Sequence, residues 1–208
     1  MNMRIEAAPD TPQFFAARRG CLTASRMKDV LAVGAKGQPL KARDDYLMEL
    51  VAERMTGIAV SHYVTDAMTW GLENEAGAVA AYEEASGNLA TTAGFILHPT
   101  IEHCGASPDR FVDPDGILEC KCPTTTKYLA WLRAGVVPDE HKPQMLLQLA
   151  CTRRQYCDFV AFDPRVQIGP KLFVRRFEPK REDIEAVEEA ARVFLAEVQA
   201  MFKQVTEN

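Results

Sequence analysis

Apolar residues recur at helical spacing in several stretches of the chain. Between residues 41 and 55 they fall at Tyr46, Leu47, Leu50, Val51 and Met55, which is the three-to-four-residue period of an amphipathic helix. A longer helix is predicted over residues 66–85, and Gly87 is suited to end it because glycine readily adopts a left-handed backbone. The same periodicity predicts helices over residues 11–19, 23–32, 124–134, 141–152 and 182–202, with Thr23 capping the second of these and a loop at 34–39.

Short apolar runs between turn residues predict the strands. They cover residues 94–98, 103–106, 110–112, 117–122, 156–162 and 171–177. Ser107-Pro108-Asp109 and Asp113-Pro114-Asp115-Gly116 separate three of them, and both segments are typical of turns. Helices alternate with groups of strands, so we predict an α/β (α+β) fold with a central mixed β-sheet flanked by helices. Without a repeat or a flexible linker, residues 1–208 are expected to form a single domain.

Composition places the chain among globular proteins. Hydrophobic residues make up 47% of the 208 positions and charged residues 25%. No apolar run approaches the ~20 residues that span a bilayer, and the N-terminus lacks an apolar signal segment. We therefore expect a cytoplasmic protein with no membrane partner. The six cysteines form no CxxC pair; a zinc or iron–sulfur site is the alternative, but their spacing favours buried apolar thiols.

The net charge of −5 is unevenly distributed. Residues 178–208 hold eight acidic and four basic side chains, whereas residues 1–43 hold eight basic and three acidic ones. A basic face near the N-terminus is therefore compatible with a polyanionic partner, despite the overall acidity.

Three charged residues carry the candidate chemistry. Glu119 and Lys121 lie two apart on a predicted strand, so they point to the same face. The turn at residues 113–116 folds the chain back and can bring Asp109 beside Glu119. Two carboxylates suit Mg²⁺, and the lysine can assist deprotonation or stabilise the transition state at a phosphate. The alternative is a surface hairpin with an ordinary ion pair.

Neighbouring helices offer further polar groups for such a site. Glu75, on the helix before the hairpin, supplies a third carboxylate. Gln144 follows the hairpin, with Gln148 one turn further on, and an amide there can hold the attacking water or a phosphate oxygen. Each glutamine alone is also compatible with a solvated surface.

Six motifs, in order over residues 14–165, resemble the λ-exonuclease or YqaJ-type viral recombinase family of the PD-(D/E)xK nuclease superfamily. They are Arg18-Arg19-Gly20-Cys21-Leu22-Thr23-Ala24-Ser25, Trp70-Gly71 with Glu75, Ser107-Pro108-Asp109-Arg110, Glu119-Cys120-Lys121-Cys122-Pro123, Gln144, and Phe162-Asp163-Pro164-Arg165. Two features depart from the family pattern: Arg110 replaces a frequent glycine, and Phe14-Phe15 stand where tryptophan is common.

The resemblance implies a magnesium-dependent 5′-to-3′ exonuclease on double-stranded DNA, in which Mn²⁺ can replace Mg²⁺. Such an enzyme releases 5′-mononucleotides and leaves a 3′-ended single strand for phage-type recombination. The family also implies a ring-shaped homotrimer and a single-strand annealing protein as partner, in the cytoplasm of a bacterial host.

The resemblance also implies roles for individual residues. Glu75, Asp109 and Glu119 would be metal ligands together with the Cys120 carbonyl, Lys121 would be the catalytic lysine, and Gln144 would be the helical glutamine of the active site. Arg18 and Ser25 would bind the terminal 5′-phosphate, with Arg19 a weaker candidate. If Thr23 caps a helix, Ser25 lies in its first turn, where free N–H groups favour anions.

Two alternatives remain open from the sequence. The first is an endonuclease or repair nuclease of the same superfamily, with the same active site but a different polarity. The second is a non-catalytic DNA-binding or annealing protein on the nuclease fold, against which the intact Asp109, Glu119 and Lys121 argue.

Overall fold

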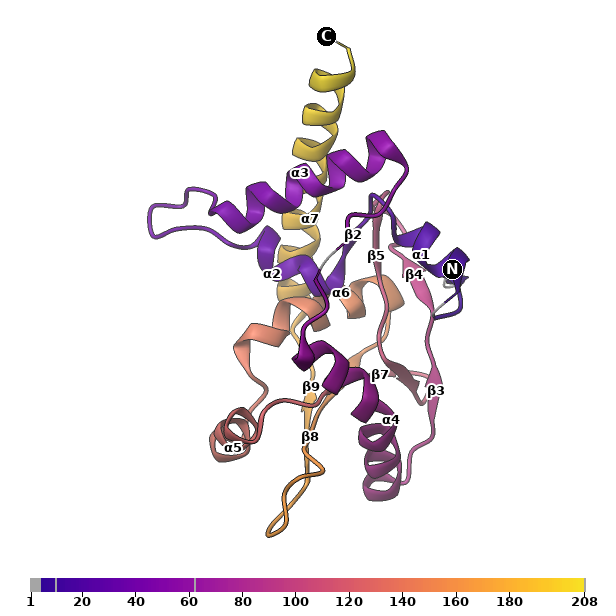
Figure 1. Ribbon diagram of the computed structural model, residues 1–208, viewed down its shortest axis with the longest axis vertical. Helices are drawn as coiled ribbons and strands as arrows, with labels where there is room; N and C mark the ends of the chain where they lie inside the picture. The colour runs from indigo at the N-terminus through magenta and orange to yellow at the C-terminus, as the bar shows by residue number, and fades with distance from the viewer. Residues whose placement is uncertain (1–4, 10, 62, 208) are drawn as a thin grey trace.

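Two β-sheets and the helices around them form the structure, a computed structural model that describes residues 5–9, 11–61 and 63–207 (Figure 1). The four-stranded sheet has the order β1-β4-β5-β2 and the five-stranded sheet the order β3-β6-β7-β8-β9. The predicted mixed α/β class is confirmed, but the strands divide into two mixed sheets instead of one. The chain passes from the first sheet to the second directly after β5, through Ser107-Pro108-Asp109.

The five-stranded sheet is built on the hairpin that the turn residues predict. Its strands are β3 (Ala90–Thr92), β6 (Arg110–Val112), β7 (Gly116–Lys121), β8 (Tyr156–Phe162) and β9 (Leu172–Phe177). β6 and β7 pair antiparallel, whereas β7 and β8 pair parallel, with Glu119 opposite Phe159. The parallel pair needs a crossover, which α5 (Thr125–Ala134), the short 3₁₀ turn η2 (Asp139–His141) and α6 (Lys142–Thr152) supply.

Alternate residues of β7 enter two different cores. Leu118 and Cys120 pack with α4 (Asp66–Ser86) on one face, whereas Ile117 packs with α5 and α6 on the other. Because side chains alternate along a strand, Glu119 and Lys121 share the face of Ile117 and point toward α6. Gly87 ends α4 in a left-handed conformation with φ of 74°, as the sequence predicts.

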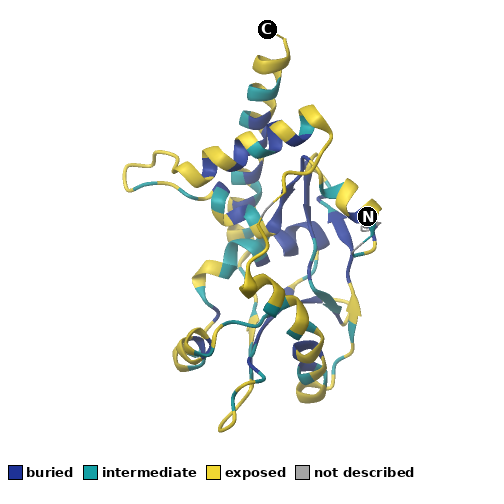
Figure 2. Ribbon diagram, in the orientation of Figure 1, coloured by how far each residue is buried: buried dark blue, intermediate teal, exposed yellow. Residues whose placement is uncertain are grey.

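The four-stranded sheet is made of very short strands. These are β1 (Ile5–Ala7), β2 (Leu22–Thr23), β4 (Phe95–Leu97) and β5 (Cys104–Ala106). One face packs on α1 (Pro12–Arg18), where Phe14 contacts Phe95. The opposite face, dark blue at the centre of Figure 2, lies in the largest core.

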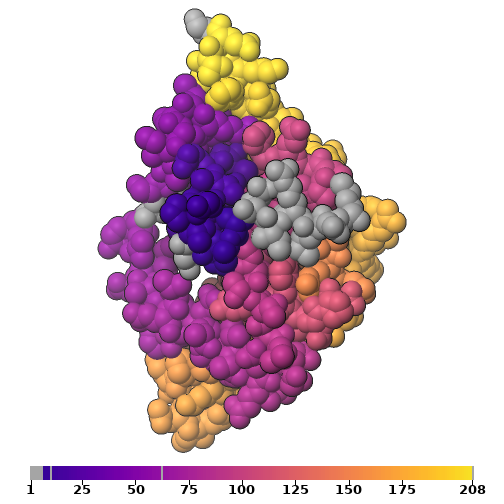
Figure 3. All heavy atoms as spheres, turned by 90° about the vertical axis from the view of Figure 1, so that its right-hand side faces the viewer, coloured from indigo at the N-terminus to yellow at the C-terminus, as the bar shows by residue number. Residues whose placement is uncertain are grey.

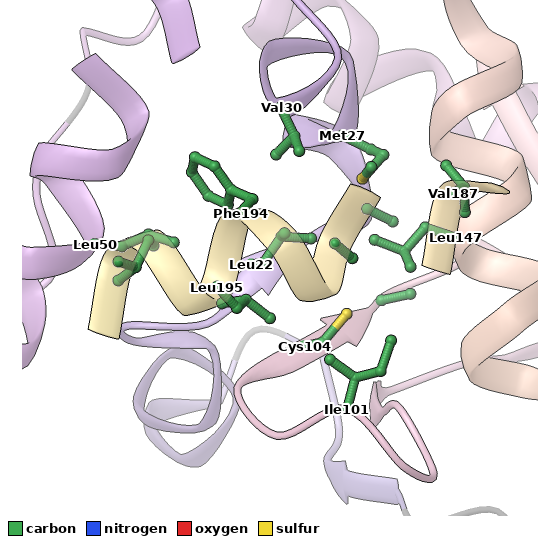
Figure 4. Close-up of a cluster of buried hydrophobic side chains, with 14 of the residues drawn as sticks. Leu22, Met27, Val30, Leu50, Ile101, Cys104, Leu147, Val187, Phe194 and Leu195 are labelled. Atoms are coloured by element: carbon green, nitrogen blue, oxygen red, sulfur yellow. The ribbon is translucent and has the colours of Figure 1, made fainter. Parts of the chain in front are cut away.

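The largest core joins this sheet to four helices: α2 (Met27–Val30), α3 (Lys41–Thr56), α6 and α7 (Arg181–Thr206). Figure 4 shows Phe194 and Leu195 of α7 among Leu22, Leu147 and Cys104. Arg43 of α3 fastens the helices further through two hydrogen bonds of 2.6 and 3.0 Å to the Glu197 carboxylate. The C-terminal end of α7 extends beyond this core, as the yellow segment in Figures 1 and 3.

One predicted helix is wrong. Residues 23–32 do not form a continuous helix, because Thr23 belongs to β2 and is followed by a 3₁₀ turn, η1 (Ala24–Arg26), and then by the four-residue α2. Thr23 makes no side-chain capping hydrogen bond. Its backbone N–H donates instead to the buried Tyr46 hydroxyl, at 3.1 Å. This tertiary hydrogen bond holds Thr23 in an extended conformation where the sequence predicted the start of a helix.

None of the helices in the described part of the chain is long and apolar enough to cross a membrane.

Replacing Phe194 with alanine is expected to lower the free energy of unfolding by about 3–5 kcal/mol, because it leaves a cavity in the core and removes the stacking on Tyr46. Urea unfolding measures the change. Val193→Ala is the control: its side chain is 48% exposed, and the change should stay within about 0.5 kcal/mol. Equal losses in both variants would contradict the assignment of this core.

Candidate active site

A buried carboxylate lies at the centre of the site. Glu119 is only 1% exposed and is surrounded by three donors. Lys121 donates to Oε1, Gln144 donates to the same oxygen at 2.6 Å, and Gln148 donates to Oε2 at 2.6 Å. Since a buried carboxylate is costly without partners, these hydrogen bonds offset the cost of burying Glu119.

The two glutamines come from one face of α6, one turn apart. Gln148 is fully buried, so a solvated surface position is wrong for this residue, and Gln144 is half-buried. Both amides orient Glu119 in this structure. A role of Gln144 in holding water or phosphate stays a prediction.

Asp109 lies where the chain passes between the two sheets. Its Oδ2 accepts a hydrogen bond of 2.6 Å from the Cys120 N–H, while the Cys120 side chain packs toward α4. Burial, together with the negative charge of Glu119, raises the pKa of Asp109 well above its ordinary value. Burial alone would lower the pKa of Lys121, but Glu119 and Asp109 outweigh it and raise that pKa, so Lys121 stays a cation.

Glu75 reaches the same region from α4. Its Oε1 accepts a hydrogen bond of 2.8 Å from Arg110, the residue after Asp109. The helix is braced further along by Tyr82, whose hydroxyl donates to the buried Asp158 at 2.7 Å.

A cavity of about 850 Å³ opens onto these groups. Glu75, Asp109, Cys120 and Lys121 form part of its wall. The remaining wall comes from the start of α4, the end of β7, α5, His141 and Arg165. The structure therefore brings together the residues that the sequence predicted as catalytic or metal-binding, with Glu119 and its glutamines behind the wall.

The predicted phosphate residues are placed differently from one another. Arg18 is half-buried, lies over the rings of Phe14 and Phe95, and donates to Ser107 Oγ at 2.8 Å, two residues before Asp109. Ser25 is exposed and lies in the 3₁₀ turn, with its hydroxyl 3.4 Å from that of Thr23. The argument from a helix N-terminus at Ser25 is therefore wrong. Among the described residues, no contact joins Ser25 to Arg18.

Among the wall residues that the sequence reasoning did not propose for the site are His141 and Arg165. His141 is held between Trp131 and Phe159, with ring centroids 5.2 and 5.4 Å away. Arg165 lies over the Trp70 ring and bonds to the buried Asp163 at 2.7 Å. Arg165 belongs to a recognised motif and could have been proposed, whereas no local pattern marks His141.

The residues fit a divalent cation by their chemistry. Three carboxylates, which offer hard oxygen donors, lie in this region, and the pKa of Asp109 is raised first by its burial and then by the negative charge of Glu119. Across residues 5–9, 11–61 and 63–207, no three His, Cys, Asp or Glu side chains form a ready-made metal cluster. Glu75 and Glu119 are instead bonded to protein donors, so ligation would require them to exchange partners.

Comparisons with known proteins identify relatives of this chain. The family model of the YqaJ-like viral recombinase domain matches residues 13–155. Two crystal structures of LHK-Exo, described as an alkaline exonuclease from Laribacter hongkongensis and as LHK-Exo in complex with dAMP, are 38% identical. They superpose with TM-scores of 0.85 and 0.86, covering 95% of this chain and 97% of theirs.

A phage related exonuclease from Haemophilus somnus 129PT shares the fold alone. It has 13% identity and a TM-score of 0.66, covering 89% of this chain and 96% of its own. A comparison with curated proteins finds no match.

The fold and the site together define a DNA exonuclease. The chain belongs to the YqaJ-like viral recombinase domain family.

His141 predicts how stability depends on pH. Burial and the nearby Lys121 lower its pKa from 6.5 to about 4, so the unfolded chain binds more protons between these values. The contribution is fully present above pH 6.5 and is lost as the pH falls toward 4. From pH 7.5 to pH 5 the wild type should lose about 2 kcal/mol more stability than His141→Gln, at 1.36 kcal/mol per pKa unit.

Urea unfolding of both proteins in a chelating buffer measures this difference. Parallel pH profiles for the two proteins would show that His141 is not held neutral by the fold.

Proposed function

We propose that this exonuclease is magnesium-dependent and digests one strand of double-stranded DNA from its 5′ end. The products would be 5′-mononucleotides and a 3′-ended single strand. The observation that carries the proposal is that Glu75, Asp109 and the protonated Lys121 line one cavity, with Glu119 behind its wall and bonded to Lys121. Divalent ions are general in nucleases of this type, and Mg²⁺, with Mn²⁺ as a substitute, suits an all-oxygen donor set.

The carboxylates and the Cys120 carbonyl would hold the cation. Bound there, a divalent cation supplies Lewis-acid polarisation of the phosphate and lowers the pKa of water. Lys121 lies at the cavity wall as a fixed cation, which stabilises negative charge that develops on the phosphate. Because its pKa is raised, we assign it this electrostatic role in preference to that of a base. Gln144 and Gln148 keep the Glu119 carboxylate oriented.

The 5′ polarity is supported by Arg18. Its guanidinium is tied to Ser107, close in sequence to Asp109, and a guanidinium is suited to forked bonds with phosphate oxygens. We propose that Arg18 binds the 5′-phosphate of the degraded strand, with Ser25 as a second contact. The relative crystallised with dAMP, a 5′-mononucleotide, supports a product of this class.

The remaining parts of the proposal rest on family membership. They are a homotrimeric ring, a single-strand annealing protein as partner, and action in phage-type recombination in the bacterial cytoplasm. The alternative hypothesis is an endonuclease or repair nuclease of different polarity. Product lengths followed over time separate the two, because an exonuclease releases mononucleotides from the start.

Lys121→Ala should reduce the rate of duplex digestion by about 10²–10³-fold, since it removes a preorganised charge at the reacting phosphate. DNA binding should change little. Because Lys121 is one of the three donors to the buried Glu119, its loss should also lower the unfolding midpoint, so rates are compared at a temperature where both proteins are folded. Lys127→Ala is the matched control: this lysine lines the same cavity but is 47% exposed and pairs with Glu140. Near-normal turnover by Lys121→Ala would refute the assigned role.

A second prediction concerns the end of the DNA. Wild-type enzyme should digest a 5′-phosphorylated duplex faster than the same duplex with 5′-hydroxyl ends, because Arg18 loses its anionic partner in the second. Arg18→Ala should remove most of this preference, while Arg19→Ala, which changes the adjacent exposed arginine, should retain it. Initial rates on both duplexes measure the effect. Equal wild-type rates would refute the pocket and favour the endonuclease reading.

A further inference from the structure

Arg110 is a cationic residue beside the site that the proposed mechanism does not use. It stands directly after Asp109. Its Nη1 donates to Glu75 Oε1 at 2.8 Å and to the Asp109 carbonyl at 2.5 Å. The side chains of Arg110 and Glu75 are 23% and 30% exposed, so solvent screens this ion pair less than a surface pair.

Two of the three carboxylates of the site are each paired with a positively charged side chain, and among the described residues the third is not. Lys121 pairs with Glu119 and Arg110 pairs with Glu75. Asp109, within the described residues, is held by the Cys120 N–H alone. Arginine keeps its charge throughout the physiological pH range, so Arg110 is a permanent cation beside one of the three carboxylates.

A divalent cation and a guanidinium compete for the same carboxylate. To coordinate a cation, the Glu75 oxygen must give up part or all of its bond to Arg110. The guanidinium also reduces the negative potential that attracts the ion, because two charges this close near a protein surface interact strongly.

We propose that Arg110 is an internal competitor for Glu75, which weakens divalent-cation binding and makes Glu75 the ligand that must be released before the site is complete. The inference rests on the cation site of the proposed function. It adds that the affinity of this protein for the divalent cation is lowered by a residue that is not itself a ligand.

The test is a calorimetric titration of Mn²⁺ into the full-length protein without DNA. Arg110→Ala should bind Mn²⁺ at least about tenfold more tightly than wild type, and Arg110→Lys should fall between them, because lysine lacks the forked guanidinium. Lys127→Ala removes one positive charge from the same cavity without touching Glu75. Its affinity should stay within about twofold of wild type, below ~0.5 kcal/mol.

A double-mutant cycle makes the test specific to the ion pair. In a Glu75→Gln background, Arg110→Ala should change the affinity by less than about twofold, because the contested carboxylate is gone. Thermal unfolding of each variant establishes that it is folded.

Unchanged or weaker binding by folded Arg110→Ala would overturn the inference and leave the metal site standing. An equal gain in Mn²⁺ affinity when Arg110→Ala is made in the Glu75→Gln background would also overturn it. The gain would then come from the loss of one positive charge and not from the release of Glu75. If neither wild type nor Arg110→Ala binds Mn²⁺, the proposed cation site itself fails. Binding by Arg110→Ala alone would support strong competition.

Discussion

Burial of the Glu119 carboxylate inside the protein holds the rest of the site in place. Removing a carboxylate from water costs several kcal/mol, and the loss is offset only when its oxygens are bonded in good geometry. Here the donors come from β7 itself and from two turns of α6. The strand and the crossover helix must therefore keep one relative position, which a purely apolar contact between them would not require.

The site forms where the two sheets meet. Asp109 belongs to the segment that leaves the four-stranded sheet, and Glu119 belongs to the second strand of the hairpin that follows. Arg18 joins this junction from α1 through Ser107, and α4 brings Glu75 from the other face of the five-stranded sheet. Few of these contacts are local, so the carboxylates lie close together only when α1, α4 and the two sheets are packed against one another.

Electrostatic imbalance links this architecture to the activity. The fold neutralises Glu119 with Lys121 and Glu75 with Arg110, whereas the pKa of Asp109 remains raised by burial and by its neighbours. A cation entering the cavity would relieve that imbalance. The same ion pairs reduce the electrostatic repulsion between the neighbouring carboxylates. This allows the protein to fold around a cluster of like charges.

Local sequence patterns were enough to predict the long helices, the hairpin with its turns, and the common face of Glu119 and Lys121, because periods of 3.6 and 2 and turn chemistry are local properties. Six ordered motifs also pointed correctly to the family. Tertiary packing, by contrast, sets the separation into two sheets, the β2 strand at Thr23 and the burial of Gln148. Strands of two or three residues carry no periodic signal, and a glutamine is buried only when a distant carboxylate needs its amide.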